Sequence, residues 1–318
     1  MPVRFISPSL GGYSGPLKAR QWQVDVAYRR LSADQWFVGS DVREAAAPFG
    51  QPLLLNIKSL DATVSYGVTD QFSLTLTLPF SHGTHSRYYT DGSRHQVVAS
   101  GLGDVSLVGN MWLRNPAEHP DGNVAVGFGL KTPSGDNGVI DDVFLANGPP
   151  TRTTVDQSIQ LGDGGLGVIL QAQAFQKLFN RTSGYLYGWY LLTPREQTNV
   201  PSPLAGVPLS VPDVYSVRSG LAHALSPKRG VSVSLGTRID GIPVRDIVGG
   251  SNGFRRPGYS LYLDPGVAIA HRRGTLALNV PVRLHENFGR SLADIQKGAT
   301  GGGDLAGYLI LVGYSLRF

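Results

Sequence analysis

The stretch Phe72-Ser-Leu-Thr-Leu-Thr-Leu-Pro-Phe80 alternates between large apolar side chains and Ser, Thr or Pro. A period of two is the pattern of a β-strand, because successive side chains of a strand point to opposite faces. The same alternation recurs at residues 231–239 and 276–284. One face is apolar throughout and the other is small or polar. This pattern is expected when one face meets lipid and the other faces an aqueous interior.

The alternation continues along the chain and predicts about twelve strands, near residues 21–30, 54–68, 72–84, 102–114, 122–133, 165–178, 183–193, 213–225, 230–240, 258–270, 274–286 and 304–318. The connections between them alternate between short ones and long ones. Short periplasmic turns and longer outer loops are typical of outer-membrane barrels. We therefore expect an all-β fold, a single up-and-down antiparallel transmembrane β-barrel. It would form one domain over residues 1–318, with residues 1–20 as a periplasmic N-terminal segment.

The composition excludes several other classes of protein. Charged residues make up only 16% of the chain, below the roughly 25% of soluble proteins. No run of about 18 uncharged apolar residues is present, so membrane-spanning helices are not expected. The chain has 41 glycines, which strands and turns tolerate better than long helices do. It has no cysteine, which excludes a disulfide scaffold, a thiolate metal site and a cysteine nucleophile.

The net charge of +5 does not predict nucleic-acid binding, because the basic residues form no stripe along the sequence. The densest pairs, Lys228-Arg229, Arg255-Arg256 and Arg272-Arg273, fall in expected turns or loops. Outer-membrane lipid, phosphate-rich lipopolysaccharide and small anionic solutes are the expected partners.

The C-terminal residues favour export to the outer membrane, whereas the N-terminal residues contain no export signal. Residues 308–318 alternate up to the terminal Phe318, and such an ending is similar to the signal that outer-membrane assembly machinery recognises. An edge strand of a soluble sandwich is the alternative, although its long apolar face would promote aggregation. The first residues show no apolar core of the 7–15 residues that a secretory signal contains. We expect a removed leader.

Aromatic residues recur near the ends of the expected strands, where rings at the lipid headgroup level would form girdles. On this interpretation a set of nine rings faces lipid, namely Trp22, Tyr28, Phe72, Phe80, Tyr185, Tyr187, Trp189, Tyr259 and Tyr314.

The segment Ser-Gly-Leu-Gly-Asp-Val-Ser-Leu at residues 100–107 resembles a strand opening of an outer-membrane family of phenol-degradation (MetA-pathway) transporters. Residues 65–74 and the ending Tyr-Ser-Leu-Arg-Phe are similar too, and with the hairpin rhythm the resemblance spans most of the chain. That family is loosely akin to hydrophobic-compound channels such as the long-chain fatty-acid transporter. The resemblance implies transport of small, hydrophobic or aromatic compounds, and no binding residue carries over from it.

The alternation also predicts which charged side chains face the interior. We expect seven of them to line the pore or set its selectivity, namely Asp61, Asp104, Lys131, Arg218, Arg238, Asp264 and Arg283. Three more are expected to face inward as well, namely Asp25, Asp240 and Arg317. Such charges could line a selective pore. The alternative for the basic residues Lys131, Arg218, Arg238 and Arg283 is an ion pair with a neighbouring interior aspartate. The long loop at residues 134–164 is expected to fold inward as a constriction.

We therefore expect a porin-like channel in the Gram-negative outer membrane, through which small solutes diffuse along a charge-lined lumen. A closed structural barrel and a lipid-modifying hydrolase are the alternatives. The candidate groups for the hydrolase are His82, His85 and Ser86, and His285 with Glu286, and they would form a site if the two clusters meet. No cofactor, metal or catalytic residue is predicted.

Overall fold

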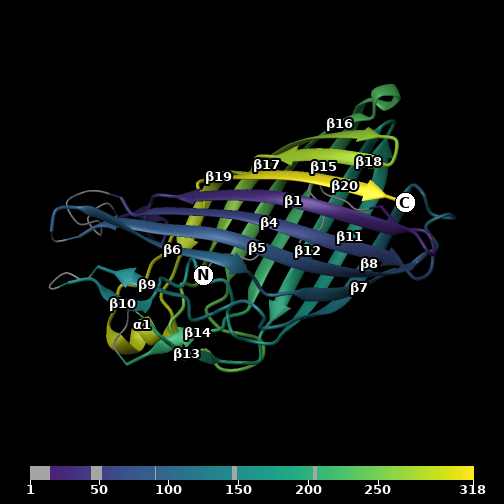
Figure 1. The fold of residues 1–318 in the computed structure, drawn as a ribbon. Coiled ribbons are helices and arrows are strands. Elements are labelled where there is room, and N and C mark those ends of the chain that lie inside the picture. The colour runs from purple at the N-terminus through teal and green to yellow at the C-terminus, as the bar shows by residue number, and fades with distance from the viewer. Residues whose placement is uncertain (1–14, 44–51, 90, 145–148, 203–205) are drawn as a thin grey trace.

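The computed structural model describes residues 15–43, 52–89, 91–144, 149–202 and 206–318. It is built almost entirely of antiparallel strands (Figure 1). The elements in chain order are β1 (Trp22–Ala33), β2 (Phe37–Val38), β3 (Asp41–Val42), β4 (Leu54–Gly67), β5 (Phe72–Tyr88), β6 (Arg94–Leu102), β7 (Ser106–Trp112), β8 (Gly122–Lys131), β9 (Ile140–Val143), β10 (Thr151–Thr154), β11 (Gly167–Phe179), β12 (Thr182–Leu192), β13 (Gln197–Pro201), β14 (Pro208–Ser210), β15 (Val214–Ser226), the 3-10 turn η3 (Pro227–Arg229), β16 (Val231–Ile242), β17 (Gly258–His271), β18 (Gly274–Asn279), β19 (Val282–Phe288), α1 (Leu292–Lys297) and β20 (Tyr308–Arg317).

The main sheet closes into a barrel because its first strand pairs with its last, with Gln23 opposite Arg317 and Ser32 opposite Tyr308. Two of its twelve strands are interrupted, one as β6 and β7 and the other as β18 and β19. The second break includes Pro281, which has no N–H for the ladder. The predicted fold class and strand number are confirmed.

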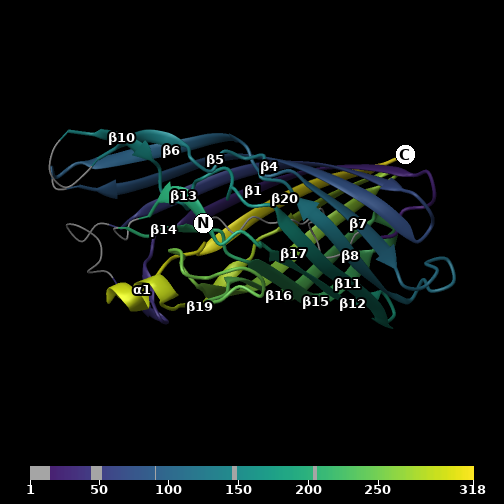
Figure 2. The same cartoon turned by 90° about the horizontal axis from the view of Figure 1, so that it is seen from below.

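The long-loop end of the barrel carries more structure than the sequence pattern predicted. Figures 1 and 2 place the small pairs β9–β10 and β13–β14 and the helix α1 at the end opposite the C-terminus. The expected loop at residues 85–101 is largely strand, since β6 pairs with the far half of β5 from Tyr88 to Phe80. Strands that continue beyond the membrane boundary need no lipid-facing apolar side, so the alternation used to find them is absent there.

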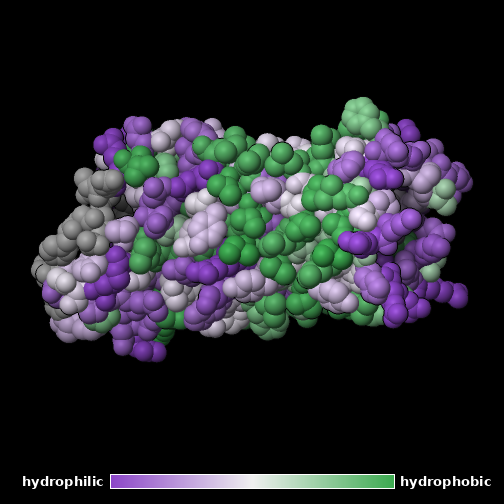
Figure 3. Space-filling view, turned by 90° about the horizontal axis from the view of Figure 1, so that it is seen from above, coloured by the Kyte–Doolittle hydropathy of each residue, from purple (hydrophilic) through white to green (hydrophobic). Residues whose placement is uncertain are grey.

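The outer wall is apolar around its middle, and Figure 3 shows this belt in green between hydrophilic ends. Phe128 is 61% exposed, Leu235 56% and Leu276 48%. When exposed apolar side chains form a continuous belt, that belt is stable only in contact with lipid. Among the described residues, no helix is long and apolar enough to cross a membrane.

Three of the nine rings assigned to the lipid face lie elsewhere, and the prediction for them was wrong. Tyr185, Tyr187 and Trp189 are 7%, 3% and 4% exposed and face the interior, whereas Leu186 between them is 45% exposed. Both faces of β12 are apolar or aromatic, so the alternation in this strand did not show which face is outward. The register with β11 and β15 decides it.

The first described residues turn into the barrel at its short-turn end. Leu17 is 8% exposed, and Arg317 donates hydrogen bonds to the carbonyls of Gly15 and Pro16. The rest of the expected periplasmic segment, residues 1–14, lies outside the described residues. At the other terminus Phe318 is 54% exposed, and its recognition by assembly machinery stays a prediction.

Candidate functional site: the barrel interior

All seven predicted pore-lining residues face the barrel interior. Six of them are at most 8% exposed, namely Asp61, Asp104, Lys131, Arg218, Arg238 and Asp264, and the side chain of Arg283 is 15% exposed. All of them except Asp61 take part in ion pairs. Arg218 lies 2.6 Å from Asp264, and the Nε atom of Arg238 lies 2.8 Å from Oδ2 of Asp240. The geometry therefore matches the ion-pair alternative, and a role in selectivity stays a prediction for these residues.

Lys131 is the centre of a buried polar knot. Its Nζ atom donates to Asp104 at 3.1 Å, to Asp163 at 2.6 Å and to the carbonyl of Gly165 at 2.7 Å. The side chains are 2%, 1% and 4% exposed for the lysine and the two aspartates. Asp104 also accepts from the backbone N–H of Gly135 at 2.9 Å. These contacts hold both ends of the long loop between β8 and β11 against the barrel wall.

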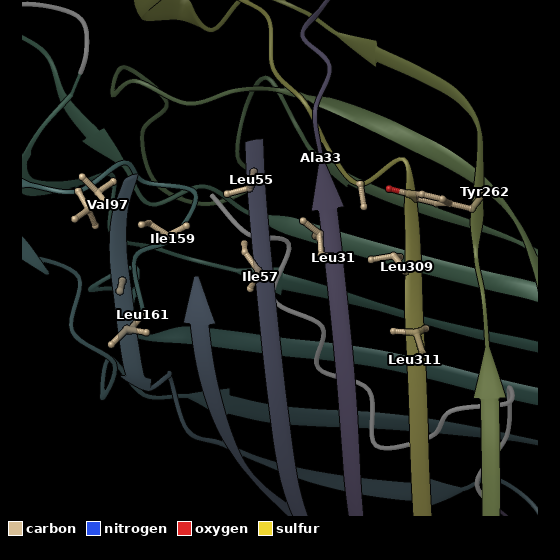
Figure 4. Packing of buried hydrophobic residues seen from close by; sticks show 13 residues of the cluster. Leu31, Ala33, Leu55, Ile57, Val97, Ile159, Leu161, Tyr262, Leu309 and Leu311 are labelled. Carbon is tan, nitrogen blue, oxygen red and sulfur yellow. The ribbon is translucent and has the colours of Figure 1, made fainter. Parts of the chain in front are cut away.

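Between these ends, the part of the loop at residues 155–165 folds into the barrel, as the sequence predicted for this connection. Ile159 and Leu161 are 2% and 7% exposed and belong to one apolar cluster with residues of β1, β4, β6 and β20 (Figure 4). Glycines make room for them: a Cβ at Gly83 would lie 2.8 Å from Ile159, and one at Gly101 would lie 2.9 Å from Leu161. We refer to residues 155–165 as the inner segment.

The space that remains beside the inner segment is small and is lined by both apolar and charged side chains. A cavity of about 50 Å³ lies between the segment and the wall, where Arg29, Asp61 and Lys131 line it. The Oδ1 atom of Asp61 is buried without a hydrogen-bond partner among the described residues, a situation that usually indicates bound water. A water molecule needs roughly 10–15 Å³, so this cavity holds only a few waters in the conformation described.

A second cavity of about 40 Å³ lies nearer the short-turn end and is lined by uncharged polar groups and rings. Asn110, Gln171 and Gln173 line it together with Trp112 and Tyr187. The sequence analysis missed this lining, because it searched the interior for charges and placed the rings of β12 outside. The inward alternation of Gln171 and Gln173 in β11 was the signal that could have shown it.

At the long-loop end, Arg256 joins several loops. Its guanidinium lies 4.3 Å from the ring centre of Trp36 and donates to the carbonyl of Gly302 at 3.0 Å. Burial lowers the pKa of Arg256, although the negative charges of Asp156 and Asp294 act to raise it. Burial by itself would raise the pKa of Asp156, but the charges of His85 and Arg256 outweigh it and hold that pKa below the usual range. The inner segment is therefore also linked electrostatically to the outer loops.

Arg283 lies between two carboxylates, 2.9 Å from Glu286 and 3.4 Å from Asp304. Burial and the neighbouring charge of Glu286 raise the pKa of Asp304, in the loop before β20, to about 8. One cation cannot fully compensate two buried anions, so Asp304 holds its proton at neutral pH.

The residues considered for a hydrolase do not form one site. His82 is exposed on the outer face of β5, whereas His85 is buried on the inner face with its Nε2 atom 4.0 Å from Asp156. His285 is exposed and lies 3.4 Å from the hydroxyl of Ser40. Among the residues with described positions, no carboxylate contacts the His285 ring to orient it. Within the same ranges no group of three or more His, Cys, Asp or Glu side chains could hold a metal ion.

These features define the class of protein. A closed barrel of twelve antiparallel strands with an apolar belt and a polar, charge-paired interior is a transmembrane β-barrel, the architecture of the outer membrane.

A solved structure with a TM-score of 0.64 to this chain supports this class. The sequence matches no family model and no curated protein. An outer membrane channel from Pseudomonas putida F1 is similar over 98% of this chain and 99% of its own, with 14% identity and a TM-score of 0.64. A FadL homologue from Pseudomonas aeruginosa covers 95% of this chain and 90% of its own at 8% identity and a TM-score of 0.43. The CymD monoaromatic hydrocarbon channel covers 95% of this chain and 89% of its own at 8% identity and a TM-score of 0.44.

Proposed function

We propose that this chain is an outer-membrane channel for small solutes, including hydrophobic or aromatic compounds, and that its inner segment is the constriction. The observation that supports this proposal best is the way the lumen is filled. The inner segment occupies it through three buried apolar side chains, Val155, Ile159 and Leu161, which pack against the wall, and through one polar knot.

The lumen on either side of the inner segment is suited to water and to solutes. Its polar atoms are not all satisfied within the protein: besides Asp61, the hydroxyl of Tyr185 and the Oδ1 atom of Asn279 are buried without a hydrogen-bond partner among the described residues. A barrel of purely structural value would be expected to satisfy or exclude such groups. Tyr187, Trp189 and Trp112 add ring faces on which an aromatic solute would pack.

Solute passage requires the inner segment to move. The cavities of about 50 and 40 Å³ are far below the roughly 300 Å³ or more of a small-molecule site. The similar Pseudomonas putida protein is described as an outer membrane channel, which supports the same role here.

Single-channel conductance of the refolded protein in a planar lipid bilayer tests the proposal. Discrete conductance steps are expected. Arg238→Ala leaves Asp240 without its cation in the lumen, so the variant should shift permeability toward cations; Arg283→Ala should act in the same direction. Arg152→Ala is the matched control, because Arg152 is 66% exposed and lies outside the barrel wall. This variant should leave the conductance and the ion selectivity unchanged. A barrel that resists SDS until boiled but gives no steps would contradict the channel and favour a closed structural barrel.

A further inference from the structure

The short-turn end of the barrel carries a rim of exposed basic residues. They come from the turns after β7, β11, β15 and β17 and from the chain entering β1, and they are Lys18, Arg20, Arg114, Lys177, Arg181, Lys228, Arg229, Arg272 and Arg273. Among the residues whose positions are described, only three exposed acidic ones lie at the same end, Asp70, Glu118 and Asp121. The cations therefore surround the barrel mouth and exceed the anions by six.

This rim accounts for the basic character of the whole chain. The sequence has 28 Lys and Arg against 23 Asp and Glu. Without the nine cations and three anions of the rim, 19 cations and 20 anions remain. The positive charge is thus concentrated at one end of the molecule, which the sequence by itself did not show.

The rim cations are largely unpaired within the protein. Lys177 lies 3.0 Å from Asp121, the one rim ion pair found in the described part of the chain. The other two carboxylates accept uncharged donors, Asp70 from the backbone N–H of Ala19 and Glu118 from the side chain of Asn115. Since intramolecular partners are missing, the rim presents free guanidinium and ammonium groups to its surroundings.

Three of the rim arginines occupy backbone conformations that favour glycine. Arg20, Arg181 and Arg272 have φ angles of 65°, 65° and 54°, and within the described ranges they are the only residues other than glycine with positive φ. A side chain makes this region unfavourable, and Gly or Asn is usual there. That all three exceptions are arginines at one rim indicates that their charge has a role outside the local turn.

The rim also lies at a specific level of the membrane. Its cations directly follow the last exposed apolar residues of the belt: Arg114 follows Leu113, Arg181 comes two residues after Phe179, and Arg20 comes two before Trp22. Basic side chains at this boundary reach the lipid phosphates while their stems stay on the apolar wall.

We propose that this basic rim binds the phosphate groups of anionic glycerophospholipids in the periplasmic leaflet of the outer membrane. The short turns of such barrels face the periplasm, whereas lipopolysaccharide lies in the opposite leaflet. The guanidinium fork pairs with phosphate through two hydrogen bonds, which suits the repeated use of arginine here. Lipid binding at the rim does not depend on whether the lumen conducts.

The chain contains its own probe for a test. Trp22 is 46% exposed on the outer wall beside Arg20, while Trp112 and Trp189 are each 4% exposed inside the barrel. The fourth tryptophan, Trp36, is half-buried against Arg256 at the long-loop end, so a Trp36→Phe background leaves Trp22 as the exposed indole. Quenching of Trp22 by brominated phosphatidylglycerol, compared with brominated phosphatidylcholine in vesicles, reports which lipid lies at the rim. We expect a preference for phosphatidylglycerol of about fivefold or more, since one cation near an anionic surface contributes about that factor.

Two triple variants remove equal charge from opposite ends. The rim variant carries Lys18→Gln, Arg20→Asn and Arg273→Gln, with Asn chosen because it tolerates a positive φ. The control variant carries substitutions at three exposed cations of the long-loop end, Arg43→Gln, Arg245→Gln and Lys297→Gln. The rim variant should lose the preference for phosphatidylglycerol and the control variant should keep it, with SDS resistance confirming that both fold.

Two outcomes would overturn the proposal. Equal quenching by the two lipids in the wild-type protein would mean that the rim selects no anionic lipid and is available to a soluble acidic partner. Loss of the preference in inorganic phosphate, but not in chloride of the same ionic strength, would instead make the rim a site for free phosphate.

Discussion

Replacement of Lys131 by methionine tests whether the polar knot holds the inner segment in the lumen. The substitution preserves the length and apolar stem of the side chain and removes the ammonium that contacts Asp104 and Asp163. Both carboxylates then remain buried in the closed conformation without a cation. When the inner segment leaves the lumen, Asp163 reaches water and the penalty is relieved.

The size of the effect follows from these contacts. Removing one partner of a buried ion pair costs about 3–5 kcal/mol. The apolar part of the closure, Val155, Ile159 and Leu161, contributes about 1.5–3 kcal/mol for each side chain. Loss of the knot thus removes about a third of what holds the segment, and 3 kcal/mol corresponds to an increase of about 100-fold in the ratio of open to closed barrels.

The assay is the open probability of single refolded barrels in a planar bilayer. Lys177→Met is the matched control, because its ion pair with Asp121 joins side chains that are 52% and 66% exposed, and such surface pairs contribute about 0–1 kcal/mol. Lys131→Met should open the channel and Lys177→Met should leave it unchanged. An unchanged open probability for a Lys131→Met barrel that still resists SDS would refute the assignment of the knot as the closing contact.

Three further substitutions address closure, pH dependence and backbone strain. Gly83→Ala should displace Ile159, because the new Cβ would lie 2.8 Å from its Cγ2 atom, with a loss of about 1–3 kcal/mol in unfolding free energy; an unchanged urea midpoint would contradict this packing. Asp304→Asn should flatten the pH dependence of stability. Burial raises the folded pKa of Asp304 from 3.8 to about 8, so between these pH values the folded state holds a proton that the unfolded state has lost. Stability therefore falls as pH rises through this window. Thermal loss of SDS resistance, measured against pH in both proteins, should show a smaller slope in the Asp304→Asn variant. Arg181→Asn should raise the unfolding free energy by about 0.5–1 kcal/mol, because φ is 65° there, and a lower urea midpoint would show that the arginine makes a compensating contact.

The sequence by itself determined the barrel. Alternation is a local property, and one lipid-facing side is enough to reveal it, so the strands around residues 72–80 and 231–239 and the inward direction of Arg218 and Arg238 were predictable. The inward folding of the loop after β8 was also expected from the sequence. The alternation rests on forces that act within one strand, whereas the inward packing of the loop depends on contacts with distant strands.

The tertiary structure decided which groups meet. Arg218 on β15 pairs with Asp264 two strands away on β17, and Lys131 pairs with Asp163 from a loop, because closure of the barrel places them face to face. The direction of Tyr187 depended on its neighbours, since both faces of its strand are apolar. The basic rim likewise exists only because up-and-down topology brings turns far apart in the sequence to one end. Sequence periodicity fixes the face on which a side chain lies, whereas partners and shared surfaces follow from the closed arrangement of all twelve strands.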